Sequence, residues 1–179
     1  MNLYHCTTHD RGTIFVVEPR PPAKWERNNE PDTPRLCVAP SVPQCIAAMN
    51  DTVRDPLIVY VADDPCEAIP AKSVGDSIYS HEYWLMPGTR LTRSTLIPPQ
   101  FPREIYMLTD SLLRQVKGTI IGRHYRVALL YAACQVLSEY APKKLSLAAQ
   151  GYCEEMGLDT SVLSCSQVCG RTAGAKTCG

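Results

Sequence analysis

The chain has 179 residues, of which 45% are hydrophobic and 20% are charged. This length suits one domain with a core, or a domain with a helical appendage, and the composition excludes a disordered chain. Lys plus Arg and Asp plus Glu are equal at 18 each, so no overall field attracts nucleic acid or an anionic membrane.

The first residues, 1–5, have neither a basic segment nor an apolar one, and no stretch approaches the roughly 18 apolar residues of a spanning helix. We therefore expect a cytoplasmic protein that does not enter a membrane. The nine cysteines are expected to be reduced thiols, because a chain of this size does not need disulfides. Four lie in apolar stretches and are predicted to be buried: Cys37, Cys45, Cys134 and Cys153.

Short apolar and β-branched segments dominate the first hundred residues and predict a sheet. The expected strands are 3–7, 13–17, 35–39, 57–62, 76–79 and 82–86. Ser41 is expected to cap a helix over 44–49, with Pro43 in its first turn. Prolines and charges alternate over 20–34, which predicts a surface loop where a lid or substrate loop could lie.

The pattern changes to helical spacing after the prolines that end near residue 102. Apolar stripes predict helices over 105–116 and 125–137, a third over 145–156, and a short fourth that begins near residue 159. We expect an α+β protein: a sheet-rich domain over 1–97, followed by a helical region over 103–179 that packs on it or forms a small second unit.

No strong phosphate-binding, dinucleotide-binding, zinc-protease or hydrolase motif occurs in the sequence. Cys165 and Cys169 could belong to a thiolate-rich zinc site, but the paired C-x2-C blocks of strong zinc motifs are missing. We predict no metal, and interpret these two cysteines as neighbours on one apolar helix face.

Three strand-like segments of the N-terminal half carry polar residues in apolar surroundings. They are Leu3-Tyr4-His5-Cys6-Thr7, Arg35-Leu36-Cys37-Val38-Ala39-Pro40-Ser41 and His81-Glu82-Tyr83-Trp84-Leu85-Met86-Pro87. Their order resembles the ADP-ribosyltransferase-like superfamily, in which a first strand carries His or Arg, a second strand runs into a helix, and a later strand carries Glu. The resemblance covers about residues 3–90.

This resemblance implies that NAD is the cofactor and that an ADP-ribosyl group is transferred to an acceptor. His5 would hydrogen-bond the ribose, residues 37–41 would form a wall of the nicotinamide pocket, and Glu82 would be the catalytic carboxylate. The other candidate cofactor-binding residues are Arg35, Ser41 and Tyr83. The chemistry fits, since cleavage of the nicotinamide–ribose bond builds positive charge on the sugar, which a fixed carboxylate stabilises. The related NAD-using RNA 2′-phosphotransferases would need a basic surface, for which Arg11, Arg35 and Arg90 are candidates.

The alternative is a non-catalytic protein-binding or inhibitory module that docks on a partner through its helical half. Residues 106–140 are rich in aromatic and apolar side chains and contain basic residues such as Arg123 and Arg126. In either case we expect a protein partner or acceptor. Residues 145–167 have the length of a helix-turn-helix, but the second helix has no Arg or Lys, so we do not expect nucleic acid as a partner.

Overall fold

The computed structural model of the chain describes residues 1–18, 21, 31, 33–49, 55–65, 67–72, 77–116 and 122–138, except for the side chains of 122 and 123. The strands of this part are β1 Tyr4–Thr7, β2 Ile14–Val16, β3 Leu36–Val38, β4 Leu57–Ala62, β5 Ile69–Pro70, β6 Tyr83–Leu85 and β7 Arg90–Ile97. The helices are α1 Val42–Ala48, α2 Ser77–Ser80, α3 Gln100–Gln115 and α4 Gly122–Val136. The expected α+β class is confirmed.

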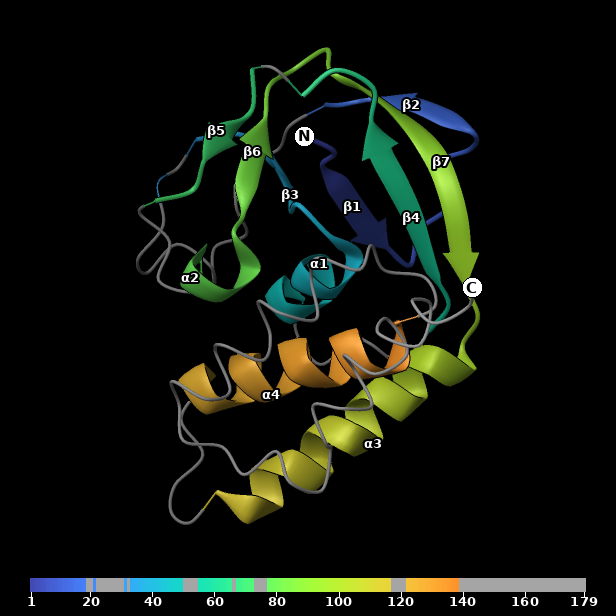
Figure 1. Cartoon of the computed structure of the whole chain (residues 1–179). Helices are drawn as coiled ribbons and strands as arrows, with labels where there is room; N and C mark the ends of the chain where they lie inside the picture. The colour runs from blue at the N-terminus through green and yellow to red at the C-terminus, as the bar shows by residue number, and fades with distance from the viewer. Residues whose placement is uncertain are drawn as a thin grey trace, which may run out of the picture.

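Two antiparallel sheets meet at the N-terminal strand (Figure 1). One sheet has the strand order β1-β4-β7-β2, and the other has the order β3-β6-β5. A single bridge connects the two sheets among the described residues, and in it Tyr4 and Ala39 exchange backbone hydrogen bonds of 2.8 and 2.9 Å. Beyond this bridge β1 and β3 diverge, so the backbone groups between the sheets need other partners.

The capped helix predicted after Ser41 is present as α1. Ser41 is extended, its Oγ accepts a hydrogen bond from Gln44 N at 3.1 Å, and Pro43 lies in the first turn. At the other end of the helix, Arg126 of α4 donates to Ala47 O at 2.7 Å and to Met49 O at 3.0 Å. Polar groups from the chain therefore satisfy both ends of α1.

The strand predicted over 76–79 is wrong for the residues that the structure describes, because 77–80 form the short helix α2. Ile78 is exposed, whereas Tyr79 is buried among residues of α1 and α4. Contact with these helices, which the local sequence does not show, outweighs the β-propensity of Ile78 and Tyr79.

Two strands were missed, β5 and the eight-residue β7. β7 contains Arg93 and Ser94 in place of a continuous apolar run, and its burial alternates only in part. It is nevertheless central, since it pairs with β4 on one side and with β2 on the other. Its pairing partners define it as a strand more than its own composition does.

The helices α3 and α4 confirm the two apolar stripes and pack beneath the sheets, with α4 between α1 and α3 (Figure 1). One core cluster joins side chains of both halves of the chain, among them Cys6 of β1, Ile46 of α1, Ile105 of α3 and Leu129 of α4. The helices thus pack on the sheet-rich part. The third and fourth predicted helices, Cys165 and Cys169 lie outside the described residues.

Four cysteines of the described part are free thiols: Cys6, Cys37, Cys45 and Cys134. Cys45 and Cys134 are buried as predicted, but Cys37 is exposed. The reason is strand alternation: Val38 is buried and Leu36 partly buried against the core, so the residue between them points to the other side. Cys153 is not among the described residues. None of the helices in the described part is long and apolar enough to cross a membrane.

Candidate functional site

His5 lies where the two sheets separate. It follows Tyr4, the last β1 residue bridged to β3, and its side chain is partly buried. Because a carbonyl oxygen only accepts hydrogen bonds, Nδ1 of His5 donates to Cys37 O, at 3.0 Å. The ring also meets Phe15 edge-on, with 6.4 Å between centroids. The imidazole of His5 therefore gives Cys37 O a hydrogen-bond partner at a place where β1 and β3 are no longer paired.

Glu82 lies immediately before β6 and is 9% exposed. Its Oε1 accepts a hydrogen bond of 2.8 Å from Nε1 of Trp84, two residues along the strand. Residues at this spacing share one face of a strand, which explains how the indole reaches the carboxylate. A neutral donor fixes the position of the carboxylate without cancelling its charge.

Arg35 covers Trp84 from the neighbouring strand. Its guanidinium carbon is 4.6 Å from the centre of the Trp84 ring, and Nη1 donates to Pro31 O at 2.8 Å and to Thr33 O at 3.2 Å. Arg35 is 7% exposed. It therefore fastens the chain before β3 onto Trp84 by a cation–π contact and two charge-assisted hydrogen bonds.

Cys37 connects His5 with the strand that follows Glu82. Its carbonyl oxygen is the partner of His5, and it is paired with Trp84 in the register of β3 and β6. Desolvation by the surrounding protein raises the pKa of the thiol far above its ordinary value; the charge of Glu82 and a hydrogen bond to Glu82 raise it further, while Arg35 lowers it. The pKa of the Cys37 thiol thus responds to both Glu82 and Arg35, in opposite directions.

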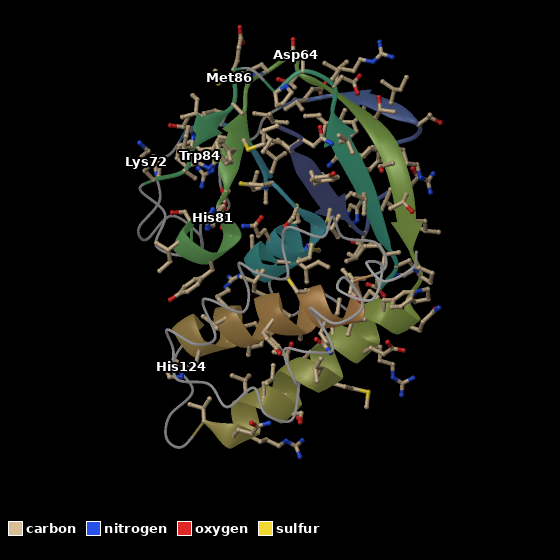
Figure 2. The ribbon with its side chains drawn as sticks, in the orientation of Figure 1. Asp64, Lys72, His81, Trp84, Met86 and His124 are labelled. Atoms are coloured by element: carbon tan, nitrogen blue, oxygen red, sulfur yellow. The ribbon has the colours of Figure 1, made fainter. Side chains whose placement is uncertain are left out.

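A small cavity of about 160 Å³ borders Glu82. Lys72, Ser77 and His81 contribute to its lining. Figure 2 shows Lys72, His81 and Trp84 on the β5–β6 side of the molecule. Burial lowers the pKa of the His81 imidazole, which favours its neutral form. The cavity thus places neutral and cationic groups beside an acidic one.

The structure does not bring every predicted residue to this point. Ser41 is fully buried, and its hydroxyl donates to Gln44 Oε1 at 2.8 Å while it caps α1. Tyr83 lines the cavity, but strand alternation turns its side chain to the face opposite Glu82, where it packs against the core of the two sheets. His5, Arg35 and Glu82 are linked through Cys37 and Trp84, whereas Ser41 is engaged elsewhere.

Trp84 is the residue of this site to which the sequence interpretation gave no role. Its signal was the spacing Glu82-x-Trp84, which places an indole donor beside a carboxylate on any extended strand. The strand itself was predicted, but recognising Trp84 also required knowing that this face of the strand is turned away from the core of the two sheets.

The other predicted cations have separate structural partners. Arg90 forms an ion pair with Asp63 at 3.1 Å, and Arg11 lies over the ring of Phe15 at 5.6 Å. Arg126 holds the end of α1, so it is not an unengaged surface charge available to a partner. The side chain of Arg123 lies outside the described part. No group of His, Cys, Asp and Glu able to hold a metal ion occurs among the residues that the structure describes.

Comparison with known proteins adds no relative. The chain matches no protein-family model, no curated protein and no solved structure.

Proposed function

We propose that the chain binds NAD where its two sheets separate and transfers the ADP-ribosyl group to an acceptor. The observation that carries the proposal is the nearly buried carboxylate of Glu82, which the Trp84 indole holds at 2.8 Å, one strand away from the carbonyl that binds His5. A charged side chain is rarely buried without a specific reason.

The reaction assigns a defined task to this carboxylate. The bond between C1′ of the ribose and the nicotinamide nitrogen breaks, and its electron pair leaves with neutral nicotinamide. Positive charge develops on the ribose, and a carboxylate at a fixed position stabilises it without having to reorganise. A new bond then forms from the acceptor atom, or from water, to C1′, and the acceptor releases its proton to solvent.

The residues fit one end of the cofactor. A volume of about 160 Å³ corresponds to about five water molecules at roughly 30 Å³ each, which is the space of a ring-sized group and less than a whole dinucleotide needs. Glu82 would face the bond that breaks, and His5 would hold the ribose. The predicted loop 20–34 falls mostly outside the described residues.

The test is the release of nicotinamide from radiolabelled NAD by the wild type, Glu82→Gln and Glu104→Gln. Glu82→Gln keeps the shape of the side chain and its oxygen acceptor but removes the charge, so we expect it to lose turnover while it still binds NAD. Glu104 is exposed on α3, and the same substitution there is the matched control that should keep full turnover.

Equal turnover by Glu82→Gln and the wild type would contradict the assignment of the carboxylate. If no variant turns over NAD or is stabilised by it in thermal unfolding, the proposal fails and the protein-binding module becomes the better interpretation.

A further inference from the structure

His81 has a backbone conformation that residues other than glycine adopt only rarely. Its φ is +48°, and it is the one non-glycine residue of the described part with a positive φ. A side chain in this left-handed region meets the following carbonyl oxygen, so the conformation costs free energy that the surrounding structure must supply. Such residues are concentrated where a site depends on an unusual direction of the chain.

The unusual residue stands between the end of α2 and Glu82. The N–H of His81 donates to Ser77 O at 2.8 Å and so closes the helix. Only one residue later, Glu82 O accepts a hydrogen bond from Ala71 N at 2.9 Å, which starts the pairing of β6 with the β5 side. Only two residues, His81 and Glu82, therefore separate helix α2 from strand β6, and the left-handed turn permits so short a connection.

The direction of the turn determines which face of β6 receives Glu82. Trp84 lies on the same face two residues later, and the bond between its Nε1 and Glu82 Oε1 is 2.8 Å. If His81 adopted an ordinary extended conformation, the chain would leave α2 in another direction and the carboxylate would no longer meet the indole.

We propose that His81 is a positioning residue whose left-handed backbone directs the Glu82 carboxylate to Trp84 and to the cavity. This inference rests on the proposed function of Glu82, but its structural content can be measured without NAD turnover.

Four substitutions separate the backbone from the ring. His81→Gly removes the ring and permits positive φ without cost, and His81→Asn keeps a side chain that tolerates this region. His81→Val and His81→Ala also remove the ring but disfavour positive φ, the β-branched Val more strongly than Ala. Ala provides the measurement if the Val variant does not fold.

The readout is the indole N–H resonance of Trp84 in a proton–nitrogen NMR spectrum of the whole chain. The sequence has two tryptophans, so Trp25→Phe assigns the Trp84 signal, and Glu82→Ala marks its position without the carboxylate. We expect the Gly and Asn variants to keep the wild-type position. The Val and Ala variants should move toward the position of Glu82→Ala.

A shift in the Gly variant as large as that in the Val variant would overturn the inference, since the ring would then be the important part. An unshifted signal in both the Val and Ala variants would also overturn it.

Turnover separates this inference from the proposed function. With an active wild type, we expect the Val variant to have a kcat about tenfold lower than that of the Gly variant, with little difference in KM, because both lack the ring and differ in their tolerance of positive φ. If the wild type is inactive but the indole signals follow the expected pattern, the proposed function fails and the positioning of Glu82 by His81 stands.

Discussion

Tyr60 holds the turn between β1 and β2 through its hydroxyl group, and the removal of that one oxygen is a clean test of the fold around His5. Tyr60 is fully buried on β4. Its hydroxyl accepts from Arg11 N at 2.9 Å and donates to Gly12 O at 3.0 Å, with Asp10 Oδ1 farther away at 3.3 Å. Tyr60→Phe keeps the ring and its edge-on contact with Phe15.

The expected cost follows from the bonds that are lost. Two partly buried hydrogen bonds at a net 0.5–1.5 kcal/mol each give a loss of about 1–3 kcal/mol in the free energy of unfolding. For a chain of this size, a central loss of about 2 kcal/mol lowers Tm by roughly 4–8 °C. Urea unfolding should show a lower midpoint with an unchanged slope, because the surface exposed on unfolding is the same.

Tyr4→Phe is the matched control. Tyr4 is partly buried against the core, and its hydroxyl has no hydrogen bond among the described residues, so its loss should change stability by less than about 0.5 kcal/mol. The reasoning is refuted if Tyr60→Phe costs no more than Tyr4→Phe.

Three further predictions concern charge and thiol chemistry. The bond from Gly12 N–H, with a smaller contribution from Arg93, holds the pKa of Asp10 below its ordinary value, so the stabilisation is present above the unfolded pKa of about 3.9 and is lost as pH falls through the folded pKa. In the wild type, the urea midpoint should therefore fall as the pH is lowered from about 5 to 2, and Asp10→Asn should make this fall smaller. An equal fall in the two proteins would contradict the linkage. Cys37 is exposed, yet its raised pKa predicts slow alkylation by iodoacetamide at pH 8. Glu82→Gln should accelerate this alkylation, measured by peptide mass spectrometry. Equal rates in the wild type and Glu82→Gln would place Glu82 away from the thiol. Arg126→Met should lower the free energy of unfolding by about 1.5–3 kcal/mol, because the end of α1 loses a charged donor, whereas a loss below about 0.5 kcal/mol in urea unfolding would show that this contact is marginal.

The sequence predicted the elements whose signals are local. The strand Leu57–Ala62 has its predicted bounds because a buried apolar run ends at acidic residues and a proline. The cap at Ser41 was predictable because a serine followed by a proline in the first turn is a local chemical pattern. β7 was missed because Arg93 and Ser94 interrupt its apolar pattern, and its pairing with β4 joins residues 29 to 40 positions apart.

The candidate site divides in the same way. His5, Arg35 and Glu82 could be named from their places on short strands, and the structure links them. Trp84 could not, since its contact with Arg35 depends on the register of β3 and β6, which joins segments nearly 50 residues apart. The positive φ of His81 was also hidden, because histidine is not a residue whose presence signals a left-handed turn as glycine does.

The binding of NAD tests the central claim most directly, because it requires neither an acceptor nor an activator. The measurement is a calorimetric titration of NAD into the wild type, with His5→Ala beside it and Tyr4→Phe as the control on the same strand. We predict saturable binding at one site to the wild type and to Tyr4→Phe, and weaker binding to His5→Ala. An absence of binding to the folded wild type, or equal affinity for wild type and His5→Ala, would contradict the account.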